Sequence, residues 1–300
     1  EQGIKRAAGA KKRGPLSSAL RFLLPARSRA KAGGAAGFPA SFSFALYNGR
    51  SNSARRHCML QVEHLTKRYG AVTAVDDLSF EIAGAGVYGF LGPNGAGKST
   101  TMNIMTGCLS ATRGTVKISG YDIYEDPREA KRRVGYLPEQ PPLYLGETPE
   151  EYLRFVGEAK GLRGAELRRQ IASVIDETGI GDMKNRRISA LSKGYRQRVG
   201  IAQALLGEPD TVILDEPTVG LDPIQILEIR ALIGQLGESR TVLISSHILS
   251  EVQAMCSRIL IISHGKLVAF DAPDALEERL ASHGGITVTA ETDAASAGAL

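Results

Sequence analysis

Cysteine is scarce in this 300-residue sequence, and no apolar run is long enough to cross a membrane. The three cysteines are odd in number and show no CxxC spacing. We therefore expect a reducing compartment, without a disulfide framework or a zinc site. No stretch approaches the roughly 20 consecutive apolar residues that a membrane-spanning helix needs. The hydropathy thus predicts that any membrane role is carried through a partner.

An excess of basic charge is also missing from most of the chain, although the formal net charge is +5. Residues 1–58 hold 12 Lys and Arg and a single acid, Glu1, which leaves 25 basic and 31 acidic residues in 59–300. The high pI therefore belongs to the first 58 residues. The mildly acidic remainder argues against a nucleic-acid partner.

Residues 1–58 are rich in Ala, Gly, Ser, Arg and Lys and show no sustained helical or strand period. This composition predicts a disordered basic leader. Met59 is the first methionine and directly precedes the first strand-like segment. We therefore interpret residue 59 as the natural start and 1–58 as non-native upstream sequence. A transit peptide or a basic membrane-surface arm is the alternative interpretation.

A glycine-rich turn lies between an apolar run at 87–91 and a helical stretch at 101–105. The turn consists of Gly92, Pro93, Asn94, Gly95, Ala96, Gly97, Lys98, Ser99 and Thr100. This spacing is typical of a phosphate-binding loop, whose backbone N–H groups and helix N-terminus wrap phosphate oxygens. We expect Lys98 to reach the β- and γ-phosphates and the Ser99 hydroxyl to bind Mg²⁺. The competing interpretation is a strand-to-helix turn with an incidental lysine.

Two carboxylates follow the apolar segment 211–214, namely Asp215 and Glu216. The carboxyl ends of strands are where ligands bind in open α/β sheets. We expect Asp215 to hold Mg²⁺ through water and Glu216 to polarise the water that attacks the γ-phosphate. Acids that merely end a strand are the alternative, which the phosphate-binding loop disfavours.

Strand and helix patterns alternate from residue 60 onward, apart from a purely helical stretch at 148–188. Buried strands alternating with helices predict an α/β domain with an inserted helical subdomain. We expect strands at 60–65, 78–82, 134–138, 211–214, 241–244, 258–263 and 266–270. The folded domain is predicted at 59–282, with the helical subdomain at about 148–200. Residues 283–300 hold one more strand-like segment, which cannot fold alone, so we expect them to begin an incomplete C-terminal extension.

The segment Leu191–Arg198 resembles the signature of ATP-binding cassette (ABC) proteins, whose usual form is LSGGQ. It departs from that form at Lys193, which replaces the first Gly, and at Tyr195, which replaces Gln. Ser192 and Gly194 match the two family residues that contact phosphate. The resemblance therefore implies nucleotide contact here, with a turnover rate that the sequence leaves open.

The remaining ABC motifs follow in the family's order. Tyr69 matches the aromatic residue that stacks on adenine, although a lone tyrosine is more often part of a core. His247 matches the histidine that contacts the γ-phosphate, although a lone histidine after a strand is usually structural. The Gly-Leu-Asp segment ending at Asp222 matches a loop that crosses between subunits. The family's glutamine after Leu-Pro is replaced by Glu139 with Gln140 next, and either residue is a candidate for that Mg²⁺-sensing position.

The resemblance spans residues 60–270 and implies a phosphate-loop NTPase core with a mainly parallel sheet, an antiparallel β subdomain and an inserted α-helical subdomain. It further implies an ATPase in which Lys98, Glu216 and His247 are catalytic. Each ATP, with Mg²⁺, would lie between one subunit's phosphate-binding loop and the opposing subunit's signature in a head-to-tail homodimer. The partner would be a separate integral-membrane permease, so the expected location is cytoplasmic, peripheral on the inner face of the cell membrane.

Within the family, the sequence segments 135–139 and 191–198 look most like those of the ATPase subunits of ABC-2-type exporters. Among these exporters, they are most similar to the gliding-motility and nitrous-oxide-reductase-maturation branch. A GTPase is excluded because the chain has no Asn-Lys-x-Asp segment. A chromosome-type ATPase would need a long coiled-coil insertion, and a translation-factor type would need two cassettes. Two alternatives remain. One is an ABC ATPase that works on a soluble assembly, and the other is a scaffold that binds ATP without hydrolysing it. The sequence does not name the transported substrate.

Overall fold

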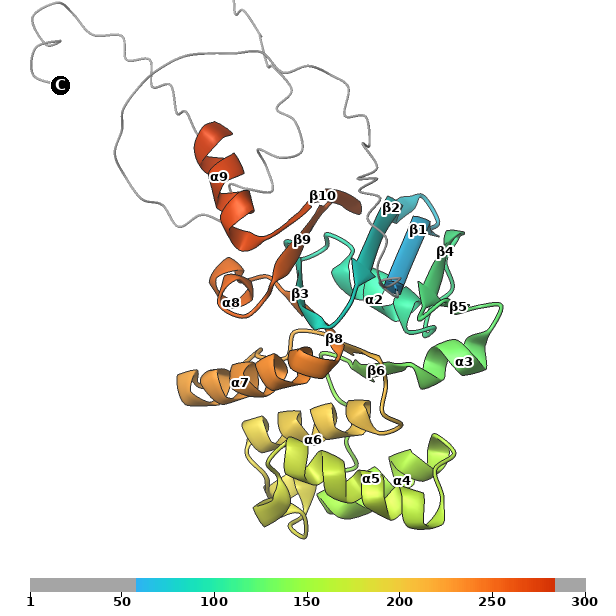
Figure 1. Cartoon of the computed structure of the whole chain (residues 1–300), viewed down its shortest axis with the longest axis vertical. Helices are drawn as coiled ribbons and strands as arrows, with labels where there is room; N and C mark the ends of the chain where they lie inside the picture. Colours follow the sequence, from blue (N-terminus) through green and yellow to red (C-terminus); the bar gives the residue numbers. More distant parts are fainter. Residues whose placement is uncertain (1–57, 284–300) are drawn as a thin grey trace, which may run out of the picture.

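Two β-sheets and a set of helices form residues 58–283, the part of the chain that the computed structural model describes (Figure 1). A four-stranded antiparallel sheet has the order β2-β1-β4-β5. A six-stranded sheet has the order β10-β9-β3-β8-β7-β6, in which only the β10–β9 pair is antiparallel. The strands are β1 Cys58–Tyr69, β2 Val72–Ala83, β3 Gly86–Leu91, β4 Arg113–Ile118, β5 Tyr121–Asp122, β6 Val134–Leu137, β7 Thr211–Leu214, β8 Thr241–Ser246, β9 Arg258–Ser263 and β10 Lys266–Asp271.

Two neighbouring strands of the six-stranded sheet, β7 and β8, are buried along their whole length. Every residue of β7 and of β8 is buried, as expected for parallel strands that are covered on both faces. In the sheet register, Leu91 at the end of β3 pairs with Ser246 at the end of β8, and Leu214 at the end of β7 pairs with Ile244. The carboxyl ends of β3, β8 and β7 therefore lie side by side at one edge.

Eight helices accompany the sheets in the described residues. They are α2 Lys98–Met105, α3 Pro127–Arg132, α4 Pro149–Ala159, α5 Gly164–Glu177, α6 Lys193–Leu205, α7 Pro223–Ser239, α8 Leu249–Gln253 and α9 Pro273–His283, with short 3₁₀ turns at Gly181–Met183 and Ile188–Ala190. Helices α4, α5 and α6 gather at one end of the molecule, away from the four-stranded sheet (Figure 1).

Helix α4 begins with a capping box. The Thr148 hydroxyl accepts a hydrogen bond from the Glu151 N–H at 3.3 Å, and the Glu151 carboxylate accepts one from the Thr148 N–H at 2.9 Å. Two N–H groups at the helix start are satisfied in this way. The hydrogen bonds also hold the pKa of the exposed Glu151 carboxyl below its usual value.

The side chains of strand β3 point alternately into two apolar cores, which the strand separates. Val87 and Leu91 pack with the helices α4 to α7, whereas Tyr88 and Phe90 pack with the four-stranded sheet and α2. Successive side chains of a strand point to opposite faces, so one strand stabilises both layers. The end of β3, where the glycine-rich turn begins, is therefore fixed from two sides.

The expected α/β architecture, with its antiparallel subdomain and its inserted helices, is confirmed. Helices α4 and α5 fall within the range 148–200, and α6 extends past it to Leu205; the subdomain bounds themselves stay a prediction. The expectations for the leader and for the C-terminal extension lie outside the described residues, except at Cys58 and His283. Across 58–283, no helix combines the length and the apolar character needed to cross a bilayer.

Candidate nucleotide-binding site

The turn between β3 and α2 has glycine where no other residue fits. Gly97 has a φ of +103°, and a Cβ there would lie 2.5 Å from the carbonyl oxygen of Ala74. Gly95 also has a positive φ, of +79°. A Cβ on Gly92 would lie 2.6 Å from the carbonyl oxygen of Ile262. Since left-handed backbone and close packing both favour glycine, the sequence specifies this turn.

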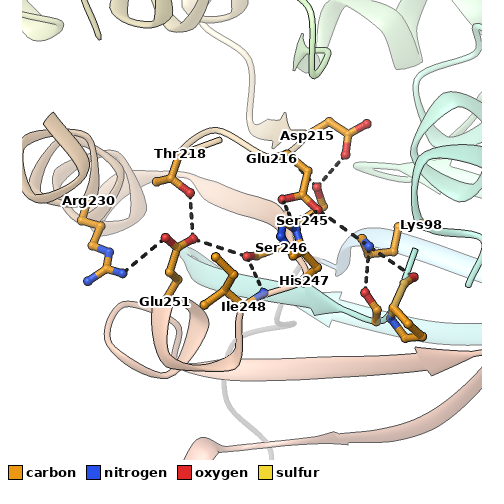
Figure 2. Close-up of polar contacts among 12 residues, drawn as sticks. Lys98, Asp215, Glu216, Thr218, Arg230, Ser245, Ser246, His247, Ile248 and Glu251 are labelled. Atoms are coloured by element: carbon orange, nitrogen blue, oxygen red, sulfur yellow. Dashed lines mark hydrogen bonds and ion pairs between the residues drawn. The ribbon is translucent and has the colours of Figure 1, made fainter. Parts of the chain in front are cut away.

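Lys98 lies at the start of α2 with its side chain folded back over the turn. Its Nζ donates a hydrogen bond to the Gly92 carbonyl oxygen at 2.8 Å and lies 3.5 Å from that of Pro93. The residue is only 7% exposed, and its Nζ is 3.7 Å from Oε1 of Glu216. The loop carbonyls thus hold a buried cation in front of a carboxylate (Figure 2).

Asp215 and Glu216 follow β7 and are both buried. Ser245 of β8 joins them, because its Oγ donates to Oδ1 of Asp215 at 2.6 Å and accepts from the Glu216 N–H at 2.7 Å. Glu216 has a φ of +47°, a left-handed conformation that is uncommon outside glycine and that concentrates at functional sites. Sequence reasoning missed Ser245; its position directly after the expected strand 241–244 and two residues before His247 was the available signal.

His247 comes directly after β8 and faces Glu216. Its Nδ1 lies 3.0 Å from Oε2 and 3.2 Å from Oε1 of that carboxylate. The His247 side chain is 40% exposed, whereas that of Glu216 is 10% exposed. Glu216 is therefore held between the Lys98 ammonium, at the start of α2, and the His247 ring, at the end of β8 (Figure 2).

These groups border a cavity of about 390 Å³. The residues that line it are Ala74, Pro93, Asn94, Gly95, Gly97, Lys98, Ser99, Thr100, Glu139, Glu216, Val219 and His247. Ala74 and Val219 were not expected from the sequence. Glu139 lines the cavity and Gln140 does not, so the geometry favours Glu139 at the position that the sequence left open. Three expected site residues, Gly92, Ala96 and Asp215, are not in the cavity lining. Asp215 is joined through Ser245 to Glu216, which lines the cavity.

The residues of the signature and of the Gly-Leu-Asp loop are not part of the cavity lining. Ser192 begins α6 and its Oγ accepts from the Tyr195 N–H at 3.3 Å; Asp222 begins α7 and its Oδ1 accepts from the Gln225 N–H at 2.9 Å. A Cβ on Gly194 would lie 2.8 Å from the Gln225 side chain, so these residues share one surface where α6 and α7 begin. We call the N-terminal ends of α6 and α7 the signature surface.

The two departures from the usual signature have local partners. The Lys193 Nζ lies against Gly220, 2.2 Å from where a Cβ on that glycine would stand. The Tyr195 hydroxyl donates to Oδ2 of Asp182 at 3.1 Å, and this hydrogen bond raises the pKa of the tyrosine. Tyr69 ends β1 half exposed, with the Lys67 Nζ 5.2 Å from its ring centre, and it is not in the cavity lining.

One tyrosine beside the site is kept protonated by its surroundings. Burial raises the pKa of Tyr136, and the negative charge of Asp215 raises it further. The Tyr136 hydroxyl lies 3.3 Å from Oδ1 of Asn103 on α2. A protonated phenol therefore ties β6 to the helix that follows the phosphate-binding turn.

The residues present fit a nucleotide and a magnesium ion. Left-handed glycines and a helix N-terminus supply inward N–H groups for phosphate, and Lys98 supplies a cation. Ser99 and Asp215 offer the hard oxygen ligands that Mg²⁺ prefers. In residues 58–283 no group of three or more His, Cys, Asp or Glu side chains stands ready to hold a metal.

Comparison with known proteins identifies the family of this chain. The ABC transporter family model matches residues 75–219. The chain is 37% identical to the linearmycin resistance ATP-binding protein LnrL of Bacillus subtilis (strain 168), over 77% of this chain and 73% of that one. It is 38% identical to the bacitracin transport ATP-binding protein BcrA of Bacillus licheniformis, over 74% and 72%.

Solved structures agree with the sequence relatives. An ATP-binding subunit of an ABC transporter superposes with a TM-score of 0.67 and 32% identity, over 75% of this chain and 95% of that one. The dimeric post-hydrolysis state of the ATP-binding cassette MJ0796, bound to ADP and Pi, superposes with a TM-score of 0.64 and 25% identity, over 71% and 98%. The phosphate-binding turn and the acidic strand end thus lie in a known class of fold.

This chain belongs to the ATP-binding subunits of ABC transporters. It is an ATPase that binds ATP.

Proposed function

We propose that this chain is one half of a head-to-tail ATPase pair that powers export through a separate membrane permease. The observation that carries the proposal is that the motif residues are divided within one chain. Lys98 and Glu216 face the cavity, whereas Ser192, Gly194 and Asp222 lie on the signature surface. A second copy that presents this surface to the cavity completes the set. The dimeric state of the related cassette with ADP and Pi supports such pairing.

Within each cavity, the residues of the Gly92–Thr100 loop bind phosphate oxygens with their N–H groups, and Lys98 neutralises the β- and γ-phosphates. Glu216 accepts a proton from the water that attacks the γ-phosphate, and His247 contacts the same phosphate. Lys98 and His247 hold Glu216 in place meanwhile, because both are within 4 Å of its carboxylate. Tyr69 stacks on the adenine.

The metal that fits the hard oxygen donors is Mg²⁺, held by the Ser99 hydroxyl and, through water, by Asp215. When bound, it neutralises charge on the phosphates. Glu139 is the candidate for the third protein group, since it lines the cavity and Gln140 does not.

The transporter class is inferred from the sequence segments 135–139 and 191–198. They resemble the corresponding segments of ABC-2-type exporters of the gliding-motility and nitrous-oxide-reductase-maturation branch. Relatives named for bacitracin transport and for lantibiotic transport, the latter SrtF of Streptococcus pyogenes at 38% identity, support an exporter. The catalytic unit is then 59–282, with the helical subdomain at about 148–200. Its place is on the inner face of the membrane, against the permease.

The test is Mg²⁺-dependent ATPase activity and ATP-dependent dimerisation of the 300-residue chain, wild type beside Glu216→Gln. The substitution keeps the shape and removes the carboxylate, so we expect retained ATP binding, a dimer trapped by ATP, and turnover lowered by about 100-fold or more. Glu81→Gln, an exposed acid on β2, is the matched control and should behave as wild type.

Full turnover in Glu216→Gln would reject Glu216 as the catalytic carboxylate. Hydrolysis by a wild type that stays monomeric at saturating ATP, in light scattering, would reject the paired site. The two results are independent of each other.

A further inference from the structure

A second buried carboxylate, Glu251 of α8, lies behind the catalytic groups and outside the cavity lining. The residue is 8% exposed. Its Oε2 accepts a hydrogen bond from Oγ1 of Thr218 at 2.7 Å and from Oγ of Ser246 at 3.4 Å. Its Oε1 lies 3.7 Å from Nη2 of Arg230 on α7. One side chain therefore joins three segments that are far apart in the sequence (Figure 2).

Thr218 connects Glu251 to the loop that follows Glu216. Within this loop the Val219 N–H donates to the Glu216 carbonyl oxygen, and the Leu221 N–H donates to that of Thr218, both at 3.2 Å. Val219 lines the cavity, and Asp222 begins α7 at the end of the loop. The hydrogen bond to Thr218 thus fixes the turn between the catalytic strand end and the signature surface.

Ser246 connects Glu251 to the backbone on both sides of His247. Ser246 directly precedes His247, and its Oγ accepts from the Ile248 N–H at 3.0 Å while it donates to Glu251. The Ser246 hydroxyl therefore donates one hydrogen bond and accepts another. Its orientation, and with it the path of the chain through His247, depends on an acceptor at Glu251.

Because Glu251 is buried, its carboxylate needs hydrogen-bond donors and a positive charge from the protein. An ionised carboxylate is an acceptor only, and a buried one is costly unless donors and a cation surround it. Thr218 and Ser246 supply the donors, and Arg230 supplies the positive charge. A neutral amide at residue 251 keeps the shape but must turn an NH₂ group toward donors or toward the Arg230 guanidinium.

We propose that Glu251 is a positioning residue for ATP hydrolysis, which keeps the loop after Glu216 and the His247 segment in register with each other. The proposal rests on the roles proposed above for Glu216 and His247. Glu251 contacts neither the cavity nor the phosphate-binding turn, so it acts on turnover and not on ATP binding. Through Asp222, the same contact links the cavity to the signature surface.

The experiment compares Glu251→Gln with wild type in the full chain, measuring kcat, KM and ATP binding by titration. We expect kcat to fall about tenfold, which corresponds to about 1.4 kcal/mol, with KM and ATP affinity within about twofold. Gln253→Ala is the matched control. Gln253 lies on the same helix and bonds Glu277 of α9 at 2.7 Å, away from both loops, so its kcat should not change.

Two further variants separate positioning from general destabilisation. Thr218→Val removes one donor at nearly constant shape and should lower kcat about threefold without changing KM. In a His247→Ala background, Glu251→Gln should lower kcat by clearly less than tenfold, because one of the two segments that Glu251 positions has already lost its catalytic group. An unchanged kcat in Glu251→Gln, an equal loss of ATP affinity, or the full tenfold loss in the His247→Ala background would each overturn the proposal.

Glu216→Gln and His247→Ala are measured beside these variants. If those two hydrolyse ATP normally, the catalytic assignments fail. If they are impaired while Glu251→Gln is not, the positioning role alone fails.

Discussion

The cavity side of this ATPase and its signature surface are built in different ways. On the cavity side, Lys98, Asp215 and Glu216 are nearly inaccessible to solvent. Lys98 is held by carbonyls of its own turn, and Ser245 of β8 bonds both Asp215 and Glu216 after β7. On the signature surface, Ser192 and Asp222 are exposed and bond only to the start of their own helices.

The difference indicates which half of the site one chain completes by itself. Parallel strands in fixed register bring the cavity residues together within the fold, so this half needs no partner to take shape. The signature surface has a defined local geometry, since each helix start is capped, but within residues 58–283 it lies apart from the cavity lining. Binding and turnover should therefore respond differently to mutations in the two regions.

The largest effect on ATP binding is expected from the cavity side. Lys98→Ala removes a buried cation that faces the phosphate-binding turn, and we expect ATP affinity to fall about 100-fold, or about 2.7 kcal/mol. Isothermal titration with ATP and Mg²⁺ measures this. An affinity within twofold of wild type would contradict the assignment of Lys98.

A comparably large effect on turnover, without an effect on binding, is expected from Gly194→Val. Gly194 is buried, and the three atoms nearest to an added Cβ all belong to the Gln225 side chain, which must move to admit the valine. That movement changes the signature surface at the point where α6 and α7 begin. We expect ATP-dependent dimerisation to be lost and kcat to fall about 100-fold, with ATP affinity within twofold. Gly234→Val on α7, where an added Cβ meets open space, is the control. Unchanged turnover in Gly194→Val would remove the distinction between the two regions.

The smallest effect separates two similar helix caps. Asp222 and Thr148 each accept a hydrogen bond from an N–H at the start of a helix, so alanine at either position should cost about 1 kcal/mol of stability. Only Asp222→Ala should also lower kcat, by about tenfold. Thermal unfolding and ATPase assays on both variants test this. Equal turnover in the Asp222→Ala and Thr148→Ala variants would mean that Asp222 only caps α7.

Much of the fold was predictable from local patterns. The strand at 211–214 has the expected bounds, because a parallel strand covered on both faces is a short continuous apolar run. The glycine-rich turn was predictable because its glycines are required by left-handed backbone and by close contacts. Strands β1 and β2 are longer than expected, with twelve residues each; several register shifts interrupt their pairing and blur the alternation on which the prediction relied.

Other parts of the site depend on contacts between distant segments. Ser245 joins Asp215 to Glu216 from a different strand, and Ala74 lines the cavity because β2 packs beside the phosphate-binding turn. The choice of Glu139 over Gln140 was open in the sequence, where both side chains are chemically suitable. Of the two, only Glu139 lines the cavity, so the structure favours it and the choice stays a prediction.

The sequence by itself determined the phosphate-binding turn, the acidic strand end and the ABC family, since each is a local pattern of residues whose chemistry or backbone freedom allows few substitutes. Only the tertiary structure decided that Lys98 and His247 hold Glu216 between them. The same is true of the contacts by which Glu251 joins Thr218 to Ser246. It also decided that the signature surface lies apart from the cavity. Those arrangements depend on the register of parallel strands and on the packing of helices, which are relations between segments that no local pattern contains.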